Sequence, residues 1–299
     1  MKMLYSACTQ PVVKSAGKIM AVVFCCHVFF NVPDLFAYDT TLVAKIRQGV
    51  DSWNRFRKDN PSYVIDLRMA DLRNANLKGI NLSKARLKKA NFSDANLVEA
   101  DLSGAELEDA NLRGVNLSRG RVSGADLSEA DLSGGFFIET DFSRSFMTRT
   151  KLKKAFLGKA TIAGANLSWS DFENANMDLA VITDAKLVGV NLKRAGLFAA
   201  VLSGSDLRDA AFVGADLRNS DLSKADLKGA DLSSSEKIAA ASLDNANLSF
   251  ANLAGADLEG AETRNTRFFG ANISAETILP DGSRGNAEWA KAREAQFVK

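Results

Sequence analysis

Residues 66–105 read DLRMADLRNANLKGINLSKARLKKANFSDANLVEADLSGA, and every fifth residue from Leu67 onward is a leucine or a phenylalanine in this stretch. The spacing continues to Leu232, and each of these central positions holds Leu, Phe, Met, Ile or Val. An alanine usually stands two residues before the central residue, as Ala70 stands before Leu72. The other three positions are mostly Asp, Asn, Ser, Gly, Lys, Arg or Glu, which suit turns and solvent. The chain is therefore built on an internal repeat of five residues.

The five-residue period predicts an extended, coiling chain rather than a helix. One face of a helix needs apolar residues three and four positions apart, and a period of five would move around the helix without forming a stripe. In extended backbone, residues two positions apart point to the same side, so the alanine and the central residue share one face. Three extended residues and a two-residue turn then change the chain direction once per repeat. We therefore predict an all-β solenoid with a narrow apolar interior.

The repeat units resemble those of the pentapeptide repeat proteins, whose pattern is A(D/N)LXX. The resemblance covers residues 65–278 and implies a right-handed quadrilateral β-helix with four repeats per coil, the central residue pointing inward. Phe92, Phe172 and Phe212 are separated by multiples of twenty residues, in agreement with four repeats per coil. About ten coils at a strand spacing of roughly 4.8 Å would make a rod roughly 50 Å long. The units that carry the resemblance include Ala70-Asp71-Leu72, Ala75-Asn76-Leu77, Ala125-Asp126-Leu127, Ala225-Asp226-Leu227 and Ala256-Asp257-Leu258.

The period shifts once, between Leu232 and Leu243, which are eleven residues apart where two periods need ten. Residues 233–237, SSSEK, fill the gap. One extra residue predicts a bulge or a small side loop, because single-residue bulges are common in sheets. The alternative is a binding loop, which would normally be longer.

The two ends of the repeat differ from it in composition, since an uncovered terminal coil would expose apolar residues and strand edges. Apolar residues at three- and four-residue spacing predict one amphipathic helix over residues 40–57, ended by Asn60-Pro61. We assign residues 38–64 to this N-terminal capping helix and a linker, and the segment resembles the capping helix of many family members. Residues 279–299 are assigned to a turn and a short helix from Asn286 to Val298, with Trp289, Ala292 and Phe297 as its docking residues. Short helical caps are thus expected at both ends.

Residues 1–37 have the layout of a secretory signal peptide. Lys14 and Lys18 precede an apolar run over residues 19–30, and Ala37 offers a small residue at a cleavage point. The run is shorter than the roughly 20 apolar residues of a membrane-spanning helix. We expect an exported protein, periplasmic or secreted. The alternative is an uncleaved anchor, which would place the chain at a membrane, or a cytoplasmic chain.

Cysteine and histidine are confined to this first segment. Cys8, Cys25, Cys26 and the only histidine, His27, lie within residues 1–37, so residues 38–299 contain neither type. This excludes thiol nucleophiles, disulfides, histidine acid–base catalysis and the usual zinc ligands from the remaining chain. No phosphate-binding loop or nucleophile elbow is present in the sequence. We therefore predict no catalytic residue, no metal, no cofactor and no small-molecule substrate, and hence a protein that is not an enzyme.

The charge of the repeat region is balanced. The formal net charge of +2 is accounted for by residues 1–37, so the remainder is neutral. A neutral body has no electrostatic drive toward nucleic acid and lacks the acidic excess of a DNA mimic. We expect a binding or scaffold protein whose partner is another protein, with a homodimer left open. The alternative comes from the resemblance, because some family members bind DNA gyrase in the cytoplasm as mimics of duplex DNA.

A few positions break the repeat rule in the middle of the chain. Apolar residues replace the usual Asp or Asn at Phe136, Phe146, Phe156, Val181 and Val201, and exposed apolar side chains suggest a contact surface. A basic cluster lies next to them in the sequence, within residues 144–159. The alternative is that these phenylalanines pack locally or are scattered surface residues. The predicted partner surface consists of Phe136, Phe146, Phe156, Arg149, Lys153 and Lys154.

We predict that the mature chain begins near Tyr38, because a basic segment, a short apolar run and a small residue occur in the order of a signal peptide. Mass spectrometry of the protein from its natural source measures the N-terminus directly. Recovery of intact residues 1–37 on a soluble cytoplasmic protein would contradict the prediction and favour the gyrase alternative.

Overall fold

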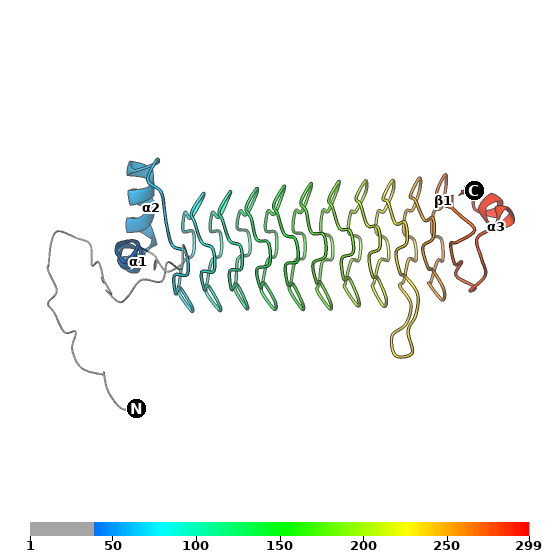
Figure 1. The fold of residues 1–299 in the computed structure, drawn as a ribbon, viewed down its shortest axis with the longest axis horizontal. Coiled ribbons are helices and arrows are strands. Elements are labelled where there is room, and N and C mark those ends of the chain that lie inside the picture. The colour runs from blue at the N-terminus through cyan, green and yellow to red at the C-terminus, as the bar shows by residue number, and fades with distance from the viewer. Residues whose placement is uncertain (1–38, 299) are drawn as a thin grey trace, which may run out of the picture. The chain divides into compact units, whose positions relative to one another are not determined.

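The computed structural model describes residues 39–298, so the predicted signal peptide lies outside the described residues. Two helices, α1 (Thr40–Arg47) and α2 (Val50–Asp59), precede a long series of coils. The coils end in β1 (Asn272–Ile273), α3 (Ala287–Ala292) and β2 (Gln296–Phe297). Figure 1 shows the coils following one another along one axis, with α1 and α2 at one end and α3 at the other. Within residues 39–298, no helix is long and apolar enough to cross a membrane.

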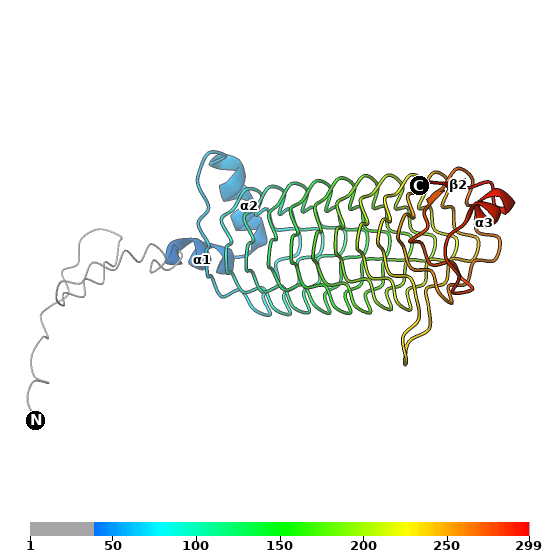
Figure 2. The ribbon, with the colours of Figure 1, turned by 45° about the vertical axis from the view of Figure 1, so that its right-hand side comes forward.

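Parallel backbone bridges join each coil to the next, and their register gives the number of residues in one coil. Asp66 pairs with Arg86, Asp71 with Asn91, and this twenty-residue step continues along the chain. Four five-residue repeats therefore complete one turn, as the stacked coils in Figure 2 illustrate. The predicted right-handed quadrilateral β-helix is confirmed.

The bridges form four columns, which define four faces of the coil. We name them by their bridged residues, which we call ladder residues; each stands just before a central residue. Face 1 runs from Asp66 to Asn272, face 2 from Asp71 to Ile278, face 3 from Asn76 to Glu262 and face 4 from Asn81 to Arg267. Successive repeats occupy successive faces, so residues ten positions apart lie on opposite faces.

The interior is filled by the central residue and by the small residue at the end of each repeat. Leu127 and Ala130 are fully buried, as are the larger Phe137 and Phe172. Where a hydroxyl replaces the alanine methyl, it donates to a backbone carbonyl, as Thr150 does to Leu127 O at 2.9 Å. Burial at about 25 cal/mol per Å² of apolar surface, repeated in every coil, makes this core the main source of stability.

The polar positions of the repeat build the corners between faces. The fourth residue of most repeats has a positive φ, for example 57° at Lys84 and 64° at Gly104. Such a turn favours glycine and asparagine, because a Cβ atom is strained in the left-handed region. The ladder Asp or Asn accepts a hydrogen bond from the backbone two residues later, as Asp101 Oδ1 does from Ser103 N at 3.0 Å. This local bond accounts for the Asp/Asn rule of the sequence.

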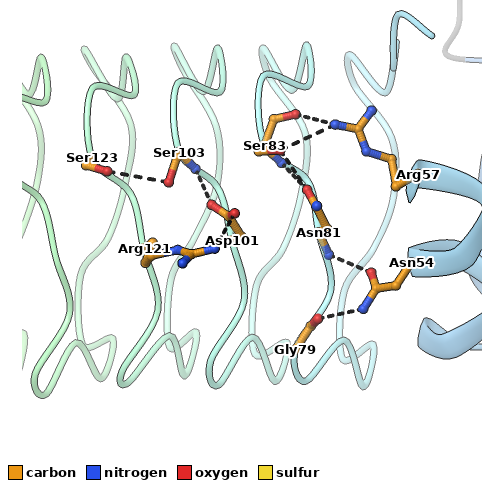
Figure 3. A network of polar contacts seen from close by, with 9 residues as sticks. All are labelled: Asn54, Arg57, Gly79, Asn81, Ser83, Asp101, Ser103, Arg121 and Ser123. Atoms are coloured by element: carbon orange, nitrogen blue, oxygen red, sulfur yellow. Dashed lines mark hydrogen bonds and ion pairs between the residues drawn. The ribbon is translucent and has the colours of Figure 1, made fainter. Parts of the chain in front are cut away.

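The N-terminal end of the coils is covered by two helices rather than the single one predicted over residues 40–57. Gly49, with a φ of 109°, separates α1 from α2 and turns the chain between them. Trp53 is fully buried and donates from Nε1 to Asn81 O at 2.7 Å. The Asn54 amide continues the strand ladder, donating to Gly79 O and accepting from Asn81 N, both at 2.9 Å (Figure 3).

Arg57 adds a further contact between α2 and the first coil. Its guanidinium donates to Ser83 O at 2.7 Å, as Figure 3 shows. Partial burial lowers the pKa of Arg57, and the nearby Asp101 carboxylate opposes that shift. Side chains of α2 therefore satisfy part of the open edge of the first coil, between Gly79 and Ser83.

The break in the period is a six-residue insertion, so a small side loop is present as predicted, but the prediction of a single extra residue is wrong. Ladder partners are twenty residues apart before the break but twenty-six apart across it, as in Asp216 and Ser242. The added residues form a protruding loop closed by an antiparallel bridge between Ser235 and Ile238 (Figure 1). One repeat plus six residues gives the same eleven-residue gap as two repeats plus one, so the sequence spacing could not distinguish them.

The C-terminal helix is shorter than predicted. It ends at Ala292, and Glu294 takes a φ of 56° before β2 pairs in parallel with β1. Of the predicted docking residues, Trp289 packs edge-on against Phe268, with ring centroids 5.1 Å apart. Ala292 is exposed, and Ala290 is buried in its place. Phe297 lies in β2 and is 37% exposed.

Several ladder aspartates are paired with an arginine two residues later. Arg208 donates to both carboxylate oxygens of Asp206 at 2.7 Å, and Arg218 binds Asp216 in the same way. These hydrogen bonds lower the pKa values of Asp206 and Asp216, against a smaller opposing effect of burial. The pairs are half-exposed, so each contributes only about 0–1 kcal/mol.

Replacing Leu127 by aspartate should destabilise the fold by several kcal/mol, because a charge would enter a column of apolar side chains without a partner. Leu127→Met should cost less than about 1.5 kcal/mol, because it conserves volume. Thermal and urea unfolding of both variants tests the inward assignment. Equal stability of both variants and the parent would show that the central position does not face the core.

The aspartate–arginine pairs predict acid destabilisation. Their folded pKa values lie below the unfolded value of about 3.9, so the stabilisation is present above that pH and is lost as the pH falls through the folded pKa. Urea unfolding at pH 7 and pH 2.5 should show a lower free energy of unfolding in acid. Asp206→Asn combined with Arg208→Gln should reduce that difference by about 0.5 kcal/mol. A free energy that rises in acid would contradict the assignment.

Candidate interaction surface

Phe136 and Phe156 are neighbours on face 3. They occupy successive ladder positions and pair by a backbone bridge. Their rings are stacked, with centroids 5.0 Å apart and planes inclined by 5°. The two side chains remain 42% and 44% exposed. The structure therefore brings together two of the three predicted phenylalanines in an exposed aromatic pair.

The third phenylalanine lies elsewhere. Phe146 bridges Asp126 and Asn166, which places it on face 1, opposite face 3. It is 54% exposed. The prediction that Phe136, Phe146 and Phe156 share one surface is therefore wrong for Phe146. Ten residues are half a coil, so residues close in sequence can point in opposite directions.

The predicted basic residues do not form one patch either. Arg149 stands at the corner between faces 1 and 2, where its guanidinium lies 3.8 Å from Glu129. Lys153 and Lys154 stand at the corner between faces 2 and 3. Lys153 binds Glu173 at 2.9 Å and Asp171 at 3.2 Å, and hydrogen bonds to these carboxylates raise its pKa. The basic cluster of the sequence thus wraps around one coil, and part of its charge is neutralised.

Other exposed apolar residues extend the aromatic pair. Ile138 is 43% exposed, Leu179 48% and Phe198 39%, and all three lie at the corner between faces 3 and 4. None of the three was predicted from the sequence, because they stand outside the ladder positions at which the repeat rule expects Asp or Asn. Listing every twentieth residue would have revealed them. We call this surface the face 3 patch, which comprises Phe136, Ile138, Phe156, Leu179 and Phe198.

Packing in the core does not explain why these exposed positions hold apolar residues. Leu179 has a φ of 61°, a conformation that costs a non-glycine residue roughly 1–2 kcal/mol. Its side chain is nearly half exposed, so little buried apolar area offsets that cost. Exposed apolar side chains that gather in one place on a soluble surface are typical of a contact site.

A polar centre interrupts the patch. Gly196 has no side chain to accept the usual bond from the amide of Phe198, and Asp178 of the preceding coil accepts it at 3.0 Å. Asn176 also donates to the Asp178 carboxylate, at 3.1 Å. On the far side of the patch, the Arg218 guanidinium lies 5.9 Å from the centre of the Phe198 ring. The patch is thus apolar at both ends, with a carboxylate between them.

Among residues 39–298, no three His, Cys, Asp or Glu side chains come together in a cluster that could hold a metal ion. Aspartates are instead spread along the ladder columns, where they bind backbone amides or neighbouring arginines.

Comparison with known proteins identifies the family. The model of pentapeptide repeats matches the chain in eight copies, spread over residues 65–158, 162–235 and 240–274. A search among curated protein sequences finds no significant match.

Several solved structures are similar to this chain. HetL, a pentapeptide repeat protein involved in heterocyst differentiation regulation from the cyanobacterium Nostoc sp. strain PCC 7120, is 32% identical, with a TM-score of 0.41. The match covers 77% of this chain and 98% of HetL. QnrB1, a plasmid-mediated fluoroquinolone resistance protein, is 20% identical over 67% of this chain and 90% of its own, with a TM-score of 0.37. The family match over most of the coils, in agreement with their twenty-residue register, shows that this chain belongs to the pentapeptide repeat family.

Proposed function

We propose that this chain is a non-enzymatic, exported scaffold that binds a protein partner through the face 3 patch. The observation that carries the proposal is the gathering of five exposed apolar side chains over four successive coils, in the middle of a regular rod. Aromatic side chains dominate the binding energy of many protein interfaces. Phe136, Phe156 and Phe198 are therefore the expected anchors.

The backbone of the rod supports this role. Ladder hydrogen bonds hold each coil on both sides, for example Phe136 N to Val115 O at 2.8 Å and Phe137 N to Phe156 O at 2.7 Å. A surface held in place before binding loses little conformational entropy when a partner docks. The stacked pair Phe136 and Phe156 is thus presented in a fixed geometry.

Export is the second element of the proposal. It is supported by the order of basic, apolar and small residues in residues 1–37. We place the protein in the periplasm or outside the cell, so its partner would be exported or exposed at the cell surface.

The alternative is a cytoplasmic mimic of DNA that binds gyrase. The charges of the rod argue against it, because acidic and basic residues balance in number and several acidic groups are paired with basic ones along the columns. Arg121 binds Asp101 at 2.6 Å and Arg119 binds Glu99 at 2.9 Å, each across one coil. A mimic of duplex DNA needs rows of unpaired negative charge to match a surface that binds phosphates.

The test is affinity capture of exported proteins from the source organism, followed by direct titration of the purified partner. Phe136→Asn with Phe156→Asn should weaken binding at least tenfold, because it removes the aromatic anchors while restoring the usual ladder residue. Phe146→Asn is the matched control, since it makes the same change on the opposite face. Equal affinity of the double variant and the parent would contradict the assignment of the binding surface.

A further inference from the structure

The face 3 patch lies at the centre of its face. Ten ladder residues form face 3, and Phe136, Phe156, Asn176 and Gly196 are the fourth to the seventh of them. Three coils therefore precede this group and three follow it. The full column in order is Asn76, Asn96, Asn116, Phe136, Phe156, Asn176, Gly196, Asp216, Ser242 and Glu262.

The size of the patch limits the kind of partner that it fits. Coils spaced by about 4.8 Å, and three extended residues about 10 Å wide, give the four patch coils a projected area of roughly 200 Å². A stable interface buries about 800 Å² per partner. The whole face of ten coils projects about 480 Å², and the side chains of both corners add to that area. A partner that extends along the entire rod therefore fits better than one that covers the patch alone.

We propose that the partner on face 3 is a second copy of this chain, antiparallel to the first and related to it by a two-fold axis between the coils of Phe156 and Asn176. This inference rests on the proposed function, because it names the occupant of the proposed binding surface. A two-fold axis at the centre of the face overlays the two rods along their full length. Each copy then contributes the same residues to an isologous contact.

Large residues meet small ones in this arrangement. Reversal about the axis sets Phe136 of one copy against Gly196 of the other, and Phe156 against Asn176. Gly196 presents no side chain, and Asp178 Oδ1 lies 3.0 Å from the place that its Cβ atom would take. The ring of Phe136 can therefore lie over bare backbone, beside that carboxylate. At the corner between faces 3 and 4, Ile138 of one copy opposes Phe198 of the other.

Opposite charges of the two copies also face each other near the two-fold axis. The coil of Lys159 opposes the coil that carries Asp178 and Leu179, and the two-fold axis repeats this contact. The methylene stem of the lysine can pack on the exposed leucine while its ammonium reaches the carboxylate. A negative group within the patch and a positive group beside it thus complement each other between copies.

A parallel pair of rods does not achieve this match. With the axis along the rod, each ladder residue would oppose itself, so Phe136 would meet Phe136 and Gly196 would meet Gly196. The corner between faces 3 and 4 would then lie against the corner between faces 2 and 3. Lys159 would meet Lys154, and Glu99 would meet Asp94, which adds repulsion between like charges. The antiparallel pair avoids all of these contacts.

Away from its centre, the antiparallel pair brings like charges together in three places along the corner between faces 3 and 4. Lys78 of one copy opposes Arg264 of the other, and the coils of Glu99 and Arg119 oppose those of Asp244 and Arg218. Each of these groups is paired within its own chain, Lys78 and Arg119 with Glu99, Arg264 with Asp244, and Arg218 with Asp216. These contacts therefore oppose the dimer only weakly.

The test is sedimentation velocity of the full chain over a range of concentrations. We expect a dimer for the parent and for Phe146→Asn, and at least a tenfold higher dissociation constant for Phe136→Asn with Phe156→Asn. Lys159→Asp alone and Asp178→Lys alone should each weaken the dimer at least fivefold. The double charge reversal should restore it, because the pair reforms with opposite signs. Thermal unfolding of each variant verifies that it is folded.

Three results would overturn the inference. The first is a parent that stays monomeric at about 100 µM. The second is a dimer that persists in the phenylalanine double variant. The third is a double charge reversal that does not recover association. A monomeric parent whose binding to an exported protein is still lost in the phenylalanine variant would refute only the second copy. It would leave the proposed function standing. A parent that forms the dimer through other residues, with no effect of face 3 on any partner, would refute both.

Discussion

The narrow interior of the coil is the constraint on which the rest of this structure depends. Four central side chains and four small ones must fill each layer, so an increase in size at one position requires a decrease nearby. Phe137 illustrates the exchange, because a Cβ atom on Gly135 would lie 2.6 Å from its ring. The glycine takes the place that alanine holds in most repeats and makes room for the larger side chain. Dense packing of this kind tolerates little change in total volume.

The outward positions follow a different rule, because the core does not depend on them. A ladder Asp or Asn contributes a local bond to the amide two residues later, as Asp141 does to Ser143 at 2.9 Å. A phenylalanine at that position gives up this bond, which is worth about 0.5–1.5 kcal/mol. Phe136 and Phe156 recover part of that loss by stacking on each other, and aromatic pairs contribute about 0.5–1.5 kcal/mol beyond their buried area. Phe146 has no aromatic ring beside it among the described residues, so its place on face 1 has no such compensation.

The sequence predicts the repeat well because one short rule is applied many times. The inward position of Leu127 and the helical cap at Trp53 can be inferred from spacing, whereas the fourfold closure was implied by the family resemblance. Spacing alone does not give the length of an insertion, because the number of repeats within the gap is unknown. The six-residue insertion therefore resembled a single extra residue. The break at Gly49 was missed for a related reason, since the apolar spacing continues across it. The glycine itself was the available signal, because it commonly ends a helix.

The candidate surface was harder to predict than the fold, because it depends on the angular position of each residue around the rod. Neighbours along the sequence occupy different faces, whereas neighbours in space are twenty residues apart. Phe146 and Arg149 therefore leave the group in which the sequence placed them, while Leu179 and Phe198 enter it. The position of a residue on this surface is given by its face and by its coil, and both follow from the number of the repeat to which it belongs. An apolar residue on such a protein is informative when its counterparts one coil away are apolar too, because a partner contacts columns of residues rather than stretches of sequence.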